Sequence, residues 1–225
     1  MKKFLTVALA GVLAASMLFT GCSKKAESKV PDKLIVGTNA EFPPFEYMND
    51  KKQPEGFDIA MIKEIGKRMG KKVEIKNMEF KSLIGAMESD SINAIIAGMT
   101  KTEKREKAVD FSDSYYTTNQ AIILKKDSKI TKLAQLDGKK IGVQEGTTGD
   151  LISSGDKFGD GKKAKVLVKG AKVKRFKKGV DAVMDLKNGS VDAVVIDELT
   201  ANEFVKKNAK KLKIVIDSAG SEYYC

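Results

Sequence analysis

From Leu34 onward, strand-like and helix-like segments alternate along the chain, and this alternation restricts its fold more than any other feature. Short apolar segments such as LIVGT (34–38) and VDAVVID (191–197) have the composition of buried strands. Between such segments, DIAMIKEIGKRMG (58–70) repeats apolar residues at helical spacing, with Asp58 placed to cap a helix. Because this order is typical of sheets covered by helices, the sequence predicts an α/β fold.

The alternation comes in two similar sets. SLIGAMESDSINAIIAGMT (82–100) and AVMDLKNGSVDAVVIDELT (182–200) both read as a short helix, a turn and a strand. We therefore expect lobe 1 over residues 33–120, a hinge or crossing strand over 121–125 and lobe 2 over 126–215. Ligands of α/β sheets bind where strands end and helices begin, which predicts a site in the cleft between the lobes.

Composition excludes several kinds of chemistry. The 225 residues include no histidine, so no Ser-His-Asp or Cys-His catalytic site and no histidine-ligated metal site can form. Cys22 and Cys225 are the two cysteines, and their places near opposite ends suggest no disulfide framework. We expect no catalytic residues, no metal site and no cofactor.

The formal net charge of +11 leaves two interpretations open. Basic proteins gain affinity for nucleic acid by releasing counterions from phosphate groups. Here the lysines are spread along the chain instead of clustering in one arm, and no nucleic-acid recognition motif accompanies them. A solvated, lysine-rich surface is the favoured interpretation, and no nucleic-acid partner is expected.

The first residues, MKKFLTVALAGVLAASMLFTGC, have a basic start, an apolar run and small residues before Cys22. This layout predicts a signal peptide over residues 1–21, and a retained membrane anchor is the alternative. It resembles a bacterial lipoprotein signal, although Phe19 stands where that signal usually has leucine. The resemblance implies lipid attachment at Cys22 and a flexible tether over 22–32. The domain is then extracytoplasmic, anchored by lipid to the outer face of the cell membrane or periplasmic.

The stretch AGMTKTEKRE (97–106) places Arg105 in the first turn of an expected helix, with Thr100 or Thr102 as its cap. That end of a helix carries partial positive charge, so a cation there is locally unfavourable. A bound carboxylate would explain the arrangement, because guanidinium and carboxylate match in charge and shape. A surface salt bridge with Glu103 or Glu106 is the alternative.

Five ordered segments resemble the polar amino-acid-binding proteins of ABC transporters, solute-binding protein family 3. They are VGTNAEFPPFEY, GFDIAMIKEI, AIIAGMTKTEKREKAVDFSDSYY, IGVQEGTTGD and VDAVVIDE. The resemblance implies a two-lobe periplasmic-binding-protein-like type II fold that closes over one free amino acid. It implies delivery to an ABC transporter permease and its ATPase subunit, with the binding protein acting as a monomer and not as an enzyme.

The resemblance also implies roles for individual residues. Arg105 would bind the ligand α-carboxylate, helped by Thr100 and Thr148. Asp197, the carbonyl of Gly98 and the hydroxyl of Thr100 would bind the ammonium group. For Asp197, capping of the following helix is a compatible structural role.

Four more residues are expected around the ligand side chain. Phe42 and Phe57 would cover its aliphatic part, although both would also fit a hydrophobic core. Relatives that bind cationic amino acids often have aspartate at the position of Asn39, so asparagine there disfavours a purely cationic ligand. Glu41 lies close enough in sequence to supply the missing charge.

The last residues differ from the family pattern. Residues 216–225, ending in SEYYC, coincide with the start of the strand that crosses back to lobe 1 in relatives. We therefore expect the C-terminal part of lobe 1 to be missing, with lower stability and impaired closure as consequences.

Two other functions remain open at this point. An enzyme similar to cyclohexadienyl dehydratases would need an acid or base over the ligand, for which Glu41 or Glu145 is available. A sensor or adaptor would use the same lobes for signalling.

Overall fold

A computed structural model describes residues 31–155, 168–216 and 222–225. The expected signal peptide, Cys22 and most of the tether therefore lie outside the described residues. So does most of AKVLVKG (164–170), which has the sequence of a strand. In the part of the chain that is described, no helix is long and apolar enough to cross a membrane.

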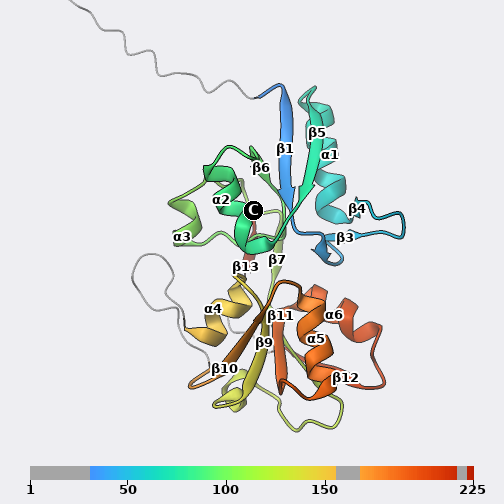
Figure 1. Ribbon diagram of the computed structural model, residues 1–225, viewed down its shortest axis with the longest axis vertical. Coiled ribbons are helices and arrows are strands. Elements are labelled where there is room, and N and C mark those ends of the chain that lie inside the picture. Colours follow the sequence, from blue (N-terminus) through green and yellow to red (C-terminus); the bar gives the residue numbers. More distant parts are fainter. Residues whose placement is uncertain (1–30, 156–167, 217–221) are drawn as a thin grey trace, which may run out of the picture. The chain divides into compact units, whose positions relative to one another are not determined.

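The first lobe is built on a parallel three-stranded sheet of order β5-β1-β6. Figure 1 shows α1 alongside β1 and β5. The strands are β1 (Lys33–Thr38), β5 (Lys72–Asn77) and β6 (Ala94–Ile95), and the helices are α1 (Phe57–Arg68), η1 (Phe80–Ser82), α2 (Leu83–Glu88) and α3 (Glu103–Glu106). A small antiparallel sheet joins β1 to α1 and consists of β2 (Glu41–Phe42), β3 (Glu46–Met48) and β4 (Pro54–Glu55).

The second lobe is built on a five-stranded sheet of order β10-β9-β11-β8-β12. Its strands β9, β10 and β11 are parallel, and β8 is antiparallel to β11 and β12. The strands are β8 (Gln120–Lys125), β9 (Lys140–Gln144), β10 (Lys172–Phe176), β11 (Ala193–Asp197) and β12 (Leu212–Ile216). The helices are η2 (Leu133–Leu136), α4 (Thr148–Ser154), α5 (Gly179–Asn188) and α6 (Glu198–Lys206).

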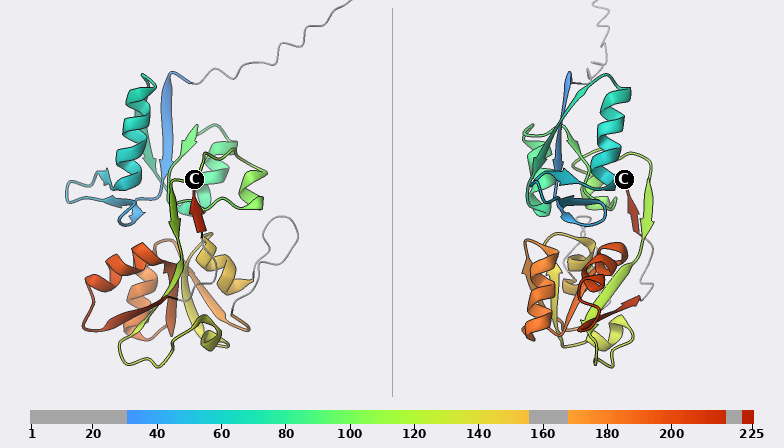
Figure 2. Two further views of the ribbon diagram at one scale, coloured as in Figure 1. Left: turned by 180° about the vertical axis from the view of Figure 1, so that it is seen from behind. Right: turned by 90° about the vertical axis from the view of Figure 1, so that its right-hand side faces the viewer.

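The crossing strands differ from the sequence prediction. Residues 121–125, expected as the hinge, lie within β8, because the buried apolar side chains of 121–124 suit a strand covered on both faces. A separate antiparallel pair, β7 (Tyr116–Thr118) and β13 (Glu222–Tyr224), lies outside both larger sheets. Both views of Figure 2 show these two strands side by side. The chain end follows β13 into the first lobe, where the amide of Cys225 donates to the carbonyl of Met99.

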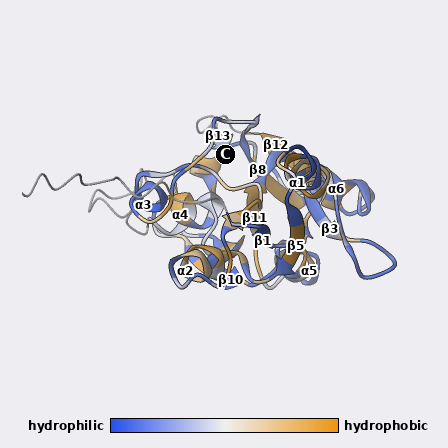
Figure 3. Cartoon of the chain, turned by 90° about the horizontal axis from the view of Figure 1, so that it is seen from above, coloured by the Kyte–Doolittle hydropathy of each residue, from blue (hydrophilic) through white to orange (hydrophobic). Residues whose placement is uncertain are grey.

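Hydrophobic packing joins the crossing pair to both lobes. Figure 3 shows hydrophobic residues on β11 and hydrophilic ones on α3. One buried cluster contains Phe42 and Phe45 of the first lobe, Tyr224 of β13 and residues of α5, α6 and β11. The ring of Phe45 lies 5.1 Å from that of Tyr224 and 5.0 Å from that of Tyr116. The two lobes are therefore packed against each other through aromatic side chains next to the crossing strands.

Candidate functional site

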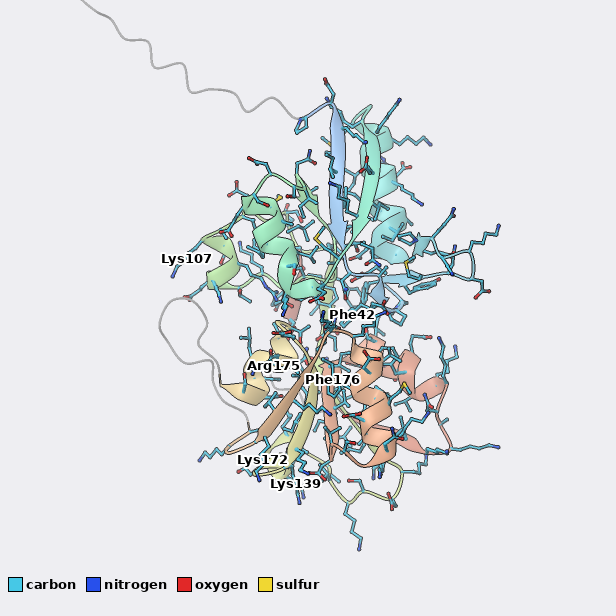
Figure 4. All side chains as sticks on the ribbon, in the orientation of Figure 1. Phe42, Lys107, Lys139, Lys172, Arg175 and Phe176 are labelled. Atoms are coloured by element: carbon cyan, nitrogen blue, oxygen red, sulfur yellow. The ribbon has the colours of Figure 1, made fainter. Side chains whose placement is uncertain are left out.

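One small cavity collects most of the residues that the sequence predicted. Arg105 and Asp197 lie in its wall, together with four other predicted residues and four that were not predicted. Its lining consists of Phe42, Phe80, Ala97, Gly98, Thr100, Arg105, Gln144, Thr147, Thr148 and Asp197. Figure 4 shows Phe42 on the side of the first lobe that faces α5 of the second. The cavity therefore has walls from both lobes.

Arg105 is a buried cation that no carboxylate pairs with in the described part of the chain. Thr102, not Thr100, caps α3, because its hydroxyl accepts from the amide of Arg105. The guanidinium donates to the carbonyl oxygens of Thr100 (2.6 Å) and Gly146 (3.0 Å). Arg105 is 8% exposed, and among the described residues it forms no ion pair, whereas Glu106 pairs with Lys101 at 2.7 Å. The surface salt bridge with Glu103 or Glu106 is therefore not formed.

Burial acts on the charge of Arg105. Removal from water lowers the pKa of its guanidinium to about 10, against the opposing attraction of Glu222 and Asp197. The guanidinium carbon also lies 5.2 Å from the centre of the Phe80 ring, within cation–π distance. The Arg105 guanidinium in the cavity wall has therefore lost hydration, and no carboxylate of the described residues forms an ion pair with it.

Asp197 is the anionic counterpart in the same cavity. It ends β11 and is 5% exposed. Its two carboxylate oxygens accept from the amide of Gln120 and the hydroxyl of Tyr224. Its side chain does not cap α6, although the residue stands at the N-cap position. Burial, followed by the negative charge of Glu222, raises the pKa of Asp197 well above its usual range, while Tyr224 and Arg105 oppose the shift.

Glu222 is a second carboxylate next to the cavity, and no sequence motif pointed to it. One of its oxygens accepts from the hydroxyl of Thr100 (2.9 Å) and from that of Thr148 (2.6 Å), one from each lobe. Its position depends on the pairing of β13 with β7. No local sequence pattern reports a pairing between residues more than 100 positions apart.

The backbone at Gly98 turns sharply into the loop that leads to Arg105. Its φ of +49° is unfavourable for residues with a Cβ atom. A Cβ there would lie 3.3 Å from the ring of Tyr224 and 3.5 Å from that of Phe42. Glycine therefore lets the backbone approach the rings of Tyr224 and Phe42 closely.

Three predicted site residues lie outside the cavity lining. Asn39 is buried and accepts from the amide of Gln144 (2.8 Å), so it joins the lobes instead of facing the cavity. Glu41 pairs with Lys178 at 2.6 Å. Phe57 is 52% exposed and stacks on Tyr115.

Phe80, and not Phe57, is the second aromatic side chain of the cavity. It follows β5, and Gln144 ends β9. Both positions fit the rule that ligands bind beyond the carboxyl ends of strands. Phe57, which was expected at the site only from the resemblance, instead begins α1.

Among the described residues, three ion pairs connect the lobes, and we call them the inter-lobe ion pairs. They are Glu41–Lys178 (2.6 Å), Glu79–Lys177 (2.6 Å) and Lys81–Glu145 (2.9 Å). All six side chains are partly exposed to solvent. Over the ranges that the structure describes, there is also no group of three or more acidic, cysteine or histidine residues placed to hold a metal ion.

The sequence matches a known family and several characterised proteins. Residues 34–222 match the bacterial extracellular solute-binding proteins, family 3. The chain is 35% identical to the arginine-binding extracellular protein ArtP of Bacillus subtilis over 224 residues, which cover 99% of this chain and 83% of that protein. It is 33% identical to a probable histidine-binding protein of Campylobacter jejuni over 228 residues, covering 99% and 84%.

Solved structures agree with these matches. The arginine-bound form of a truncated arginine-binding protein from T. maritima has a TM-score of 0.76 and 41% identity, covering 86% of each chain. The arginine-, lysine-, histidine-binding protein ArtJ from Geobacillus stearothermophilus has a TM-score of 0.76 and 38% identity, covering 85% of this chain and 80% of that one. The chain therefore belongs to family 3 of the bacterial extracellular solute-binding proteins and has their two-lobe, type II periplasmic-binding fold.

Proposed function

We propose that this protein binds a polar L-amino acid of net positive charge in the cavity between its lobes. The observation that carries the proposal is Arg105, a buried guanidinium that forms no ion pair with a carboxylate of the described residues, placed in the same cavity as Asp197. An α-carboxylate would neutralise Arg105, and an α-ammonium group would stabilise the ionised form of Asp197. The two charges of the cavity thus complement the two charges that every amino acid carries.

The charge of the cavity favours a cationic ligand. Asp197 lies in the cavity wall, and Glu222 accepts from two lining residues, Thr100 and Thr148. Together the two carboxylates outnumber the single guanidinium of Arg105, and an amino acid of net charge +1 would balance them. Binding of arginine by ArtP, and of arginine, lysine and histidine by ArtJ, supports the same class. The rings of Phe42 and Phe80 offer apolar surface to an aliphatic stem. Asn39 does not line the cavity, so its lack of charge does not count against a cationic ligand.

Residues from both lobes would contact the ligand, so binding would favour the closed arrangement. The proposal includes delivery of the amino acid to an ABC importer, consisting of a permease and its ATPase subunit. It also includes action as a monomer outside the cytoplasm, held at the membrane by a lipid on Cys22. Membership of an extracellular solute-binding family supports the location.

The carboxylates that an enzyme would use are engaged elsewhere. Glu41 and Glu145 belong to the inter-lobe ion pairs, and neither lines the cavity. An acid or base must lie within hydrogen-bond reach of the group it serves. No observation therefore favours a dehydratase over a binding protein.

Isothermal titration calorimetry with arginine, lysine, histidine, glutamine and glutamate tests the proposal. We expect saturable binding of at least one cationic amino acid, with glutamine weaker and glutamate weakest. Arg68→Met, which changes an exposed ion pair with Glu64, is the matched control for Arg105→Met. Equal affinity for glutamate and arginine, or unchanged arginine binding by Arg105→Met, would refute the proposed site.

A further inference from the structure

Next to the cavity, two buried carboxyl groups interact with each other and with no cation among the described residues. Glu46 of β3 and Asp58 of α1 are both 0% exposed. One oxygen of Asp58 accepts from the amide of Gly98 (2.8 Å) and the hydroxyl of Tyr115 (2.8 Å). Its other oxygen and both oxygens of Glu46 have no donor in the described structure. Two ionised carboxylates in this position would be strongly unfavourable.

We propose that Glu46 and Asp58 share one proton, and that the resulting hydrogen-bonded pair positions the backbone of Gly98 at the ligand site. In this arrangement the carboxyl group of Glu46 is neutral and donates to the free oxygen of Asp58. Asp58 stays ionised and keeps its two existing donors, so the pair carries a single negative charge. The proton resides on Glu46 because Asp58 already accepts two hydrogen bonds that favour its ionised form.

The surroundings favour the proton on Glu46. The titratable groups that act on it are Asp58, Asp197 and the hydroxyl groups of Tyr115 and Tyr224, none of which is a cation. Burial, followed by Asp58, raises the pKa of Glu46 well above its usual range. Burial also raises the pKa of Asp58, while the Gly98 amide and the Tyr115 hydroxyl oppose the shift.

Asp58 joins three parts of the molecule at one carboxylate. It holds the amide of Gly98 at the start of the loop to Arg105, and the hydroxyl of Tyr115 just before β7. As a residue near the start of α1 it would cap the helix, but its side chain makes no capping bond and serves these contacts instead. If the proposed function holds, Glu46 and Asp58 are positioning residues for the ammonium side of the site.

Thermal unfolding of the full chain without ligand, measured from about pH 4 to pH 9, tests the shared proton. The folded protein keeps Glu46 protonated, whereas the unfolded chain loses that proton above about pH 4.3. The contribution of Glu46 is therefore full below that pH and is lost as the pH rises through the raised folded-state pKa. In the variant Glu46→Gln, the side-chain amide would donate the same hydrogen bond without titrating, so this variant should escape the loss.

As the pH rises within this range, the melting temperature of Glu46→Gln minus that of the parent should increase by about 3–5 °C per pH unit. The titration of Asp197 should change the melting temperatures of the parent and of Glu46→Gln equally, so it does not affect the difference between them. Glu55→Gln, an exposed change on β4, should follow the parent. A constant difference between Glu46→Gln and the parent at every pH would overturn the shared proton.

Two further measurements keep the proposal testable. Infrared spectra of the Asp197→Asn variant at neutral pH, which lacks the other buried carboxyl group with a raised pKa, should contain a band from a buried protonated carboxyl group, and its absence would overturn the proposal even if Glu46→Gln failed to fold. Arginine affinity should stay within about twofold in the exposed control Glu55→Gln and fall about tenfold or more in Asp58→Asn, which replaces the ionised acceptor of Gly98. Equal losses in both variants would contradict the positioning role. If no variant binds amino acids while the pH effect persists, the proposed function fails and the shared proton stands.

Discussion

The two charged sides of the cavity are prepared differently for a ligand. On one side, Arg105 donates to two backbone carbonyl oxygens and forms no ion pair with a described residue. On the other, both oxygens of Asp197 already accept hydrogen bonds, from Gln120 and Tyr224. The guanidinium still has N–H donors available for a carboxylate. Both oxygens of Asp197 already accept one hydrogen bond each, so an ammonium group would have to share them with Gln120 and Tyr224.

The protonation of the two sides also differs. Arg105 with a pKa of about 10 remains charged at neutral pH, so its affinity for a carboxylate needs no change of protonation. The pKa of Asp197 is raised, so an ammonium ligand would have to favour loss of a proton. The cationic side would therefore attract a carboxylate equally around neutral pH, whereas the attraction of the anionic side would depend on pH.

The largest expected effect comes from removing the cationic side. Arg105→Met should weaken arginine binding at least about 100-fold, since two charge-assisted hydrogen bonds contribute about 1.5–3 kcal/mol each. The ligand-free melting temperature should change little, because the variant also removes a buried, unpaired charge. Calorimetry and thermal unfolding measure the two quantities. A large loss of stability in the ligand-free variant would show that Arg105 is mainly structural.

Removing the charge of the anionic side should have a smaller effect. Asp197→Asn keeps a similar shape but loses the charge that faces the ammonium group, and we expect binding to weaken about 10–100-fold. Asp185→Asn, in the exposed pair with Lys174, is the matched control for calorimetry. Affinities equal to that of the parent would place the ammonium group elsewhere.

The pH dependence of binding separates the two sides directly. Because the pKa of Asp197 is raised in the free protein, arginine affinity should fall as the pH drops through that pKa, by up to about tenfold per pH unit. The ligand-free chain should lose the corresponding stability as the pH rises from about 4, and ligand should restore it. Calorimetry in buffers of different ionisation enthalpy should detect release of a proton, and Asp197→Asn should abolish it. A parent without proton release would show that Asp197 is already ionised.

The smallest expected effect concerns the loop between the two sides. Gly98→Ala places a Cβ on a backbone with φ of +49°, 3.3 Å from the ring of Tyr224. A left-handed conformation costs about 1–2 kcal/mol in residues with a Cβ, so the melting temperature should fall by about 2–8 °C. Gly85→Ala in α2, where a Cβ meets no atom, should preserve or raise it. A Gly98→Ala variant as stable as the parent would mean that the loop relaxes freely.

The sequence was sufficient to predict the features that depend on neighbouring residues. Alternating segments predicted the α/β fold, and the position of Arg105 after a capping threonine identified it as a candidate for carboxylate binding. The strand β10 was missed because its sequence KVKRF carries three cationic residues. Phe57 was expected at the site only from the resemblance to the family, whereas Phe80 follows the end of β5 and lines the cavity.

Other parts of the site depend on contacts between distant residues. The place of Glu222 follows from the pairing of β13 with β7, and the bond between Gln120 and Asp197 from the register of β8 with β11. Asp58 resembled a helix cap in the sequence, and only the folded chain brings Gly98 and Tyr115 to it. These residues come together only in the tertiary structure, so no local sequence pattern predicts their contacts.

The inter-lobe ion pairs have a consequence for kinetics. Each exposed pair stabilises by only about 0–1 kcal/mol, and salt at physiological strength screens charges beyond about 8 Å. The hydrogen bonds inside the cavity are buried and much less sensitive to salt. Added salt should therefore loosen the contacts that delay opening more than those that hold the amino acid. A higher ionic strength of the surrounding medium would then shorten the residence time of the ligand more than it would weaken the hydrogen bonds that recognise the ligand.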